Sequence, residues 1–135
     1  MSRSGSESMV AGGTIEPRRF VKHNGTDNTV IQATANDITT GISAPISRKF
    51  DDRSSADSGE QLVVKRLQGE AAELEVGGTV SAGDRLKSDA SGKGVKVATT
   101  GTTVQEYGAV ADQDGASGDV IRVVIERGAL RPALT

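Results

Sequence analysis

The sequence predicts an all-β protein: a single small β-sandwich or barrel of about eight short strands, with a flexible N-terminal arm. Three observations lead to this fold class. Short runs rich in Val, Ile and Thr alternate at even spacing with turn residues, including 17 glycines, which is typical of a sandwich or barrel. No segment has the apolar periodicity of an amphipathic helix of three turns. A twelve-residue strand-and-turn unit also occurs twice.

The two copies of this unit are Ser58 to Gly69 (SGEQLVVKRLQG) and Ser117 to Gly128 (SGDVIRVVIERG). Their Ser, Gly, central Val and closing Gly are identical, and a short G-x-x-A run precedes each copy. Internal similarity is typical of duplicated structural units, although such patterns also recur by chance in chains rich in Val and Gly. Equivalent copies would place Leu62 and Ile121 in the core at matching positions.

The expected elements begin with an arm. Residues 1–13 (MSRSGSESMVAGG) have almost no apolar content, which predicts a segment outside the fold. Thr14 to Lys22 predicts a strand that lies at an edge or starts after Pro17, because proline cannot donate to a strand ladder. The pair Asn24-Gly25 predicts a hairpin turn. The next strand is expected from Asn28 to Thr34.

The polar stretch from Arg48 to Glu60 predicts an exposed excursion, followed by a strand from Gln61 to Leu67. Ala71 to Val76 fits a helix or a strand by periodicity, but its shortness and the Gly77-Gly78 stop favour a strand. The β domain is expected to span 14–128, with a tail at 129–135. Its last strands are expected after the turn V-x-A-G-D-x-L at 80–86, at Val95 to Ala98, at Val104 to Ala111 and at Val120 to Ile125.

Two of the expected turns need a glycine followed by an aspartate. These pairs are Gly83 with Asp84 and Gly118 with Asp119. Glycine reaches positive φ at no steric cost, and an aspartate side chain can accept hydrogen bonds from nearby backbone N–H groups. We therefore interpret these four residues as structural residues of turns.

Composition limits the function classes. Leu, Ile, Val and Phe total 29 of 135 residues, and there are three aromatic residues, so the core is thin and oligomerisation or docking on a larger body is expected. The net charge of −2 gives no basic field for nucleic acid. No apolar run approaches the roughly 20 residues of a membrane span, and the N-terminus lacks the apolar region of a signal peptide. The absence of cysteine excludes disulfides and thiolate metal sites.

Catalytic, cofactor-binding and metal-binding residues are not expected. The single histidine, His23, adjoins a turn, whereas nucleophilic catalysis needs a Ser or Cys beside an oriented base. Asp112 to Asp119 faintly resembles a cation loop but has too few ligands for a helical-hand calcium site. The loop from Asp89 to Lys93 is similar to the hairpin of lysine-modified carrier domains, without the Met or Asp neighbour of that lysine.

One longer pattern is G-x-V-x-A-G-D-x-L-x-x-D-x-x-G-K-x-V from Gly78 to Val95, followed by YGAVA (Tyr107 to Ala111) and ASGDVIRV (Ala116 to Val123). This pattern resembles the small capsid decoration proteins of tailed bacteriophages, also called cement or head-stabilising proteins. The resemblance covers about residues 28–127 and consists mostly of turn glycines and strand valines. The polar excursion departs from the shorter form expected there.

The resemblance implies a β-rich structural protein, commonly a homotrimer, on the outer surface of a virion head. It implies the major capsid protein as partner and assembly in the host cytoplasm, with no cofactor, nucleic acid or membrane. Segments such as the arm can order on binding. The expected partner contacts are Arg3, Met9 and Val10 in the arm and Arg48, Lys49 and Phe50 in the excursion.

Two other function classes remain open. A generic β-rich adhesion or sugar-binding module would be favoured by surface aromatic residues, but the chain has only Phe20, Phe50 and Tyr107 in total. A lysine-modified carrier domain, the less favoured alternative, would show a shift in mass from covalent modification of Lys93.

Overall fold

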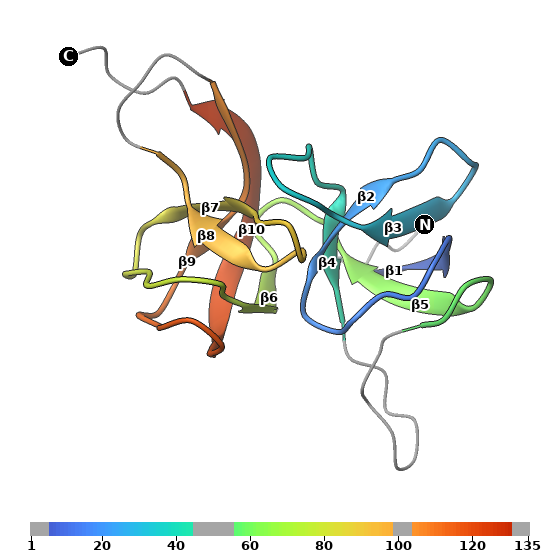
Figure 1. Ribbon diagram of the computed structural model, residues 1–135, viewed down its shortest axis with the longest axis horizontal. Helices are drawn as coiled ribbons and strands as arrows, with labels where there is room; N and C mark the ends of the chain where they lie inside the picture. The colour runs from blue at the N-terminus through green and yellow to red at the C-terminus, as the bar shows by residue number, and fades with distance from the viewer. Residues whose placement is uncertain (1–5, 45–55, 99–103, 131–135) are drawn as a thin grey trace.

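The computed structural model describes residues 6–44, 56–98 and 104–130, and in these ranges the chain is all β with no helix (Figure 1). The prediction of an all-β fold is confirmed. The number of strands differs: the described residues form ten, in two sheets of five, where about eight strands in a single sandwich or barrel were expected. Figure 1 shows the two sheets side by side, one from each half of the chain.

The first half forms a closed barrel with the spatial order β1-β3-β2-β4-β5. β1 pairs in parallel with β3 and antiparallel with β5, and these two pairings close the ring. A closed ring leaves no unpaired edge strand, so β1 completes the backbone pairing of both neighbours. The barrel strands are β1 (Ser6–Ala11), β2 (Phe20–His23), β3 (Thr29–Gln32), β4 (Gly41–Ser43) and β5 (Gln61–Lys65).

The expectation that residues 1–13 lie outside the fold is therefore wrong from Ser6 onward. Met9 and Ala11 are each 1% exposed and belong to the buried cluster of the barrel. They are two residues apart, the spacing that puts side chains on one face of a strand. Most of the apolar surroundings come from other strands, for example Leu62 and Val64 of β5, so the low apolar content of β1 itself does not make it disordered.

The β2–β3 hairpin is the one predicted from Asn24-Gly25: the two strands pair antiparallel, and Gly25 has φ of +92°. Of the two alternatives for the strand at 14–22, the start after Pro17 is confirmed, because β2 starts at Phe20 and lies between β3 and β4, not at an edge. Pro17 and Arg18 instead form a turn in which Arg18 has φ of +61°. β4 was not predicted, because three residues are too few to show a period.

The second half forms a sheet with the order β6-β10-β9-β7-β8. A bridge between Val76 and Gly94, with Gly77 N donating to the Gly94 carbonyl at 2.9 Å, links its two outer strands at one end. β10 continues to Leu130, through a register shift between Ile125 and Gly128, so the expected tail boundary at residue 129 falls inside a strand. The sheet strands are β6 (Ala71–Glu75), β7 (Arg85–Ser88), β8 (Gly94–Lys96), β9 (Gln105–Ala111) and β10 (Val120–Leu130).

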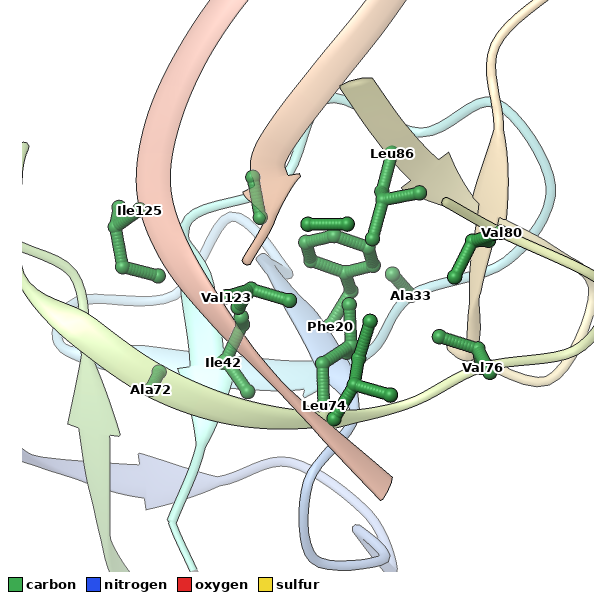
Figure 2. Packing of buried hydrophobic residues seen from close by; sticks show 13 residues of the cluster. Phe20, Ala33, Ile42, Ala72, Leu74, Val76, Val80, Leu86, Val123 and Ile125 are labelled. Atoms are coloured by element: carbon green, nitrogen blue, oxygen red, sulfur yellow. The ribbon is translucent and has the colours of Figure 1, made fainter. Parts of the chain in front are cut away.

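Phe20 connects the two halves through the core. One buried cluster fills the barrel, whereas a second lies under the sheet and also receives Phe20, Ala33 and Ile42 from the barrel half. Figure 2 shows the Phe20 ring within this second cluster, near Leu74 of β6 and Leu86 of β7. The side chain of Phe20 is 0% exposed. The second cluster is therefore shared by the two halves, whereas the first belongs to the barrel half alone.

Polar contacts reinforce the junction beside this shared core. Arg18 Nε lies 3.0 Å from Glu73 Oε1, and Arg19 Nη2 lies 3.2 Å from Glu75 Oε1. Lys93 Nζ lies 3.2 Å from the other carboxylate oxygen of Glu75. Because Arg19 and Glu75 are both largely shielded from solvent, this pair is less screened than a fully exposed one. The junction is thus fixed by charge as well as by packing.

Asp37 fixes the segment that leaves β3. Its Oδ2 accepts hydrogen bonds from the backbone N and the Oγ1 of Thr34, each at 2.7 Å, and lies 2.8 Å from Lys22 Nζ. Burial raises the pKa of Asp37, but the hydrogen bonds from Lys22 and Thr34 and the charge of Lys22 outweigh burial, so the net pKa is lowered.

We expect Asp37→Asn to reduce the free energy of unfolding at neutral pH by about 1 kcal/mol, the size of a typical net hydrogen-bond contribution. A lowered folded pKa means that the carboxylate stabilises the fold above its unfolded pKa of about 3.9 and loses this effect as pH falls through the folded pKa. Urea unfolding from pH 7 to pH 2 should therefore show the two proteins converging at the acid end. If the free energies of unfolding of the two proteins differed by the same amount from pH 7 to pH 2, the stabilising role of the Asp37 charge would be contradicted.

Candidate functional site

The described residues contain four turns of one design, in which a glycine at positive φ precedes an acidic residue. The glycines Gly59, Gly69, Gly83 and Gly118 have φ between +85° and +94°. The turns predicted at Gly83 and Gly118 both have the expected positive φ. The turns at Gly59 and Gly69, where glutamate replaces aspartate, were not predicted; the shared pattern Gly-[Asp/Glu]-x-apolar was the signal that could have found them.

Each acidic side chain closes its own turn. Asp84 Oδ2 accepts a hydrogen bond from Ser81 N at 2.9 Å, and Asp119 Oδ2 accepts one from Ala116 N at 2.9 Å. Glu60 and Glu70 accept from the equivalent residue three positions earlier, at 2.9 and 3.3 Å. In each case the residue two positions after the acid is buried: Leu62, Ala72, Leu86 and Ile121. The turns thus set the register with which four strands enter the core.

Each turn also binds a neighbouring strand through its glycine N–H. Gly83 N donates to the Ala111 carbonyl at 2.7 Å, and Gly118 N donates to the Val76 carbonyl at 2.8 Å. Gly59 makes the same contact with Ala11 at 2.8 Å. The turns are therefore part of the sheet framework and do not project freely as binding loops.

We expect Gly83→Val and Gly118→Val each to reduce the free energy of unfolding by roughly 1–3 kcal/mol, because a β-branched residue is strained at positive φ. Gly13→Val is the matched control: a Cβ at Gly13 would meet nothing within 4 Å, and its φ is not in the positive range. Thermal unfolding of the three variants tests this expectation. Equal melting temperatures for all three would contradict it.

The sequence repeat corresponds to structure only in part. Leu62 and Ile121 are 1% and 3% exposed, and Val64 and Val123 are both 0% exposed, as equivalent copies require. The ends of the two copies differ, because Gly69 lies in a turn with φ of +85° whereas Gly128 lies in β10 opposite Tyr107. The shared unit is therefore the turn and the strand that follows it, not all twelve residues.

Two of the six expected partner contacts, Met9 and Val10, lie in the described residues. Met9 faces the barrel core and is not available as a surface anchor. Val10 is half-buried and pairs with Thr29 and Gln61. The other four, Arg3, Arg48, Lys49 and Phe50, lie outside the described residues.

The polar residues considered for chemistry are dispersed. His23 is exposed at the end of β2. Asp112 pairs with Arg122 at 3.2 Å, and Asp114 accepts from Ala82 N at 2.9 Å. In the ranges that the structure describes, no group of three His, Cys, Asp or Glu side chains could hold a metal ion. Lys93 is ion-paired with Glu75 and does not project from its loop.

A hollow of about 390 Å³ lies where the barrel meets the sheet. Ile42, Ala72 and Ile121 line it and are buried, whereas Val120 is 45% exposed. Charged side chains also line the hollow: Lys65, Glu73 and Arg122. The volume lies within the range of roughly 300–1,000 Å³ of small-ligand sites, and the lining would accept an apolar group flanked by charges. This hollow could not be predicted from the sequence, since it arises only from the packing of the two halves.

Other large apolar side chains are exposed at scattered positions. Ile38, in the segment fixed by Asp37, is 73% exposed, and the others between 37% and 45% exposed are Val63, Leu67, Val104 and Val120. Single exposed apolar residues are normal on protein surfaces. The described residues include no helix of the length and hydrophobicity needed to cross a membrane.

Searches by sequence found neither a matching family model nor a matching curated protein. The fold, however, is similar to that of a phage protein. The crystal structure of the "N base" of head fiber gp8.5 of bacteriophage phi29 superimposes with a TM-score of 0.65 at 18% sequence identity. The match covers 93% of this chain and 97% of that chain. The likeness therefore extends over both halves, barrel and sheet, and at this identity it shows a shared fold.

Proposed function

We propose that this protein is a structural component of a bacteriophage virion, located on the head. The observation that carries the proposal is the match to the head fiber base of phi29 over nearly all of both chains. The resemblance of Gly78 to Val123 to decoration proteins supports the same assignment independently, because it rests on sequence motifs and not on the fold. Both lines support a structural role.

The finer form of the proposal is a decoration, or cement, protein that binds the major capsid protein on the outer surface of the head. A protein that binds the assembled capsid better than free subunits stabilises the assembled state by mass action. The architecture suits this role, because four hydrogen-bonded turns and a buried cluster shared by both halves hold the strands together around a small apolar interior.

The proposal includes a homotrimer. Three linked copies would bind three neighbouring capsid sites together, and avidity would multiply a weak contact. Sedimentation equilibrium at micromolar concentration should give three times the mass of the 135-residue chain. A monomer in solution that also binds heads as a monomer would contradict this part of the proposal without affecting the virion location.

A second candidate is the base of a fibre anchored on the head. It is favoured by the name of the phi29 protein, a head fiber base. The two candidates predict different consequences for the particle. A cement protein raises the temperature at which the capsid breaks, whereas a fibre base leaves this temperature unchanged and is needed for a fibre to attach.

The generic adhesion module and the lysine-modified carrier are supported less well. Phe20 is fully buried, and Tyr107 lies half-buried with Arg85 5.3 Å from its ring centre, so neither offers a freely exposed ring for sugar stacking. The ion pair between Lys93 and Glu75 restrains the lysine that a carrier would present for modification.

The deciding experiment mixes the purified protein with heads of its phage that lack it. We expect co-sedimentation at a fixed stoichiometry and a higher temperature of capsid disruption by calorimetry. Binding without a change in disruption temperature would favour the fibre base over the cement protein. If the protein bound neither mature heads nor empty heads, the virion proposal would be overturned.

A further inference from the structure

We propose that Asn24 is a site of spontaneous deamidation, in which the backbone nitrogen of Gly25 attacks the Asn24 side-chain amide. The residue lies just after β2, in the exposed loop between β2 and β3. The proposal concerns the chemistry of the chain itself and does not depend on the virion role.

The attacking group is accessible. Gly25 is exposed, and a Cβ built on it would meet nothing within 4 Å, so no residue beyond its chain neighbours packs against its α-carbon. Among the described residues, Gly25 N makes no hydrogen bond. The nitrogen therefore gives up no protein partner when it loses its proton and attacks.

The amide that is attacked is already polarised. Asn24 Oδ1 accepts a hydrogen bond from Thr26 N at 2.9 Å. Negative charge develops on this oxygen when a nucleophile adds to the carbonyl carbon, and a backbone N–H placed against such an oxygen stabilises the charge. The loop thus supplies both an unhindered nucleophile and a donor to the developing oxyanion.

The other two asparagines of the chain lack this arrangement. Asn28 is followed by Thr29, whose N donates to the Thr26 carbonyl at 3.1 Å, and Asn36 is followed by Asp37, whose N donates to the Thr34 carbonyl at 3.3 Å. In both cases the nitrogen that would attack is held in a hydrogen bond and precedes a bulkier residue than glycine. The structure therefore distinguishes Asn24 from the other two.

The reaction needs only water. A bond forms between Gly25 N and Asn24 Cγ, the bond between Cγ and Nδ2 breaks, and ammonia leaves with the proton from Gly25, which gives a cyclic succinimide. Water then opens the ring at either carbonyl, which gives aspartate or isoaspartate. Each event makes the net charge of −2 more negative by one unit. Asn24 and Gly25 are exposed and belong to neither buried cluster, so the reaction takes place outside the core.

The test is incubation of the full-length protein in mildly alkaline buffer, followed by peptide mapping with mass spectrometry that separates isoaspartate from aspartate. We expect progressive loss of the Asn24 peptide to succinimide, aspartate and isoaspartate forms, with Asn28 and Asn36 intact over the same period. The loss should become faster as pH rises, because the attacking nitrogen must be deprotonated. The variant Asn24→Gln serves as the control and should remove the new products.

A parallel incubation in urea separates the effect of the fold from that of the Asn-Gly sequence. Asn24 should react in the folded protein at least as fast as in the unfolded chain, whereas Asn28 and Asn36 should react more slowly when folded. Protection of Asn24 in the folded protein would overturn the proposal, since the loop would then hold the amide away from Gly25 N.

Discussion

Replacing Phe20 with alanine should lower the free energy of unfolding by about 3–5 kcal/mol, the usual cost of removing a buried aromatic ring. Phe20 is 0% exposed and belongs to the cluster that includes residues from both halves of the chain. Its removal leaves a cavity between the barrel and the sheet, so both halves lose packing. Domains of this size have a total stability of roughly 5–15 kcal/mol, so the loss is a large fraction of what holds the fold.

Urea denaturation followed by circular dichroism measures this loss. Phe20→Leu is the matched control, because it keeps an apolar side chain at the site and should cost clearly less than Phe20→Ala. If the alanine variant unfolded at the same urea concentration as the original protein, the two halves would not depend on the shared core.

Gly108 provides an independent check on this contact. A Cβ at Gly108 would lie 2.8 Å from Phe20 Cε1 and would also meet Thr39 Oγ1, so Gly108→Ala should destabilise the protein. Its cost should be smaller in the Phe20→Ala background, where the ring is absent and the new methyl group fills part of the cavity. If the losses of unfolding free energy in the two single variants simply added in the double variant, the two residues would not interact.

Much of the fold could be predicted because its signals are local. All eight predicted strands have counterparts in the structure, because the alternation of apolar and polar residues and the turn glycines can be recognised within a few residues. For example, Leu62 and Val64 alternate in β5, and Gly83 and Gly118 have the positive φ that their turns require. The Asn24-Gly25 hairpin has the same local origin.

The parts that could not be predicted depend on partners that are distant in the sequence. β1 is a strand because β3 and β5 supply its hydrogen bonds and most of its apolar surroundings, none of which can be inferred from residues 6–11 alone. The division into two sheets and the hollow beside Ile42 and Ile121 likewise arise from long-range packing. A sequence pattern fixes which face of a strand is apolar, but not which other strand covers it.

Deleting residues 2–13 should prevent the barrel from folding. The deletion removes β1, including Met9 and Ala11, each 1% exposed. It leaves the facing edges of β3 and β5 without backbone partners, so the ring of strands is no longer closed. It also removes the Ala11 carbonyl, which accepts from Gly59 N at 2.8 Å, and Ala11 N, which donates to the Glu60 carbonyl at 2.8 Å. These losses together exceed the stability of an average small domain.

Point variants in the same strand separate this structural role from a docking role. Met9→Ala should cost about 2–5 kcal/mol of unfolding free energy, as for other buried methionines. The neighbouring Ser8→Ala should change it little, because Ser8 is exposed and loses only a surface hydrogen bond to Gln61 Oε1. A truncated protein that kept its melting temperature but lost its binding to heads would contradict the barrel role of β1 and restore the segment as a docking arm. Loss of cooperative unfolding in the truncated protein would instead show that β1 is part of the fold. A large loss of stability at position 9 beside a small one at position 8 would agree, because consecutive residues of a strand point to opposite faces and only one face of β1 lies in the core.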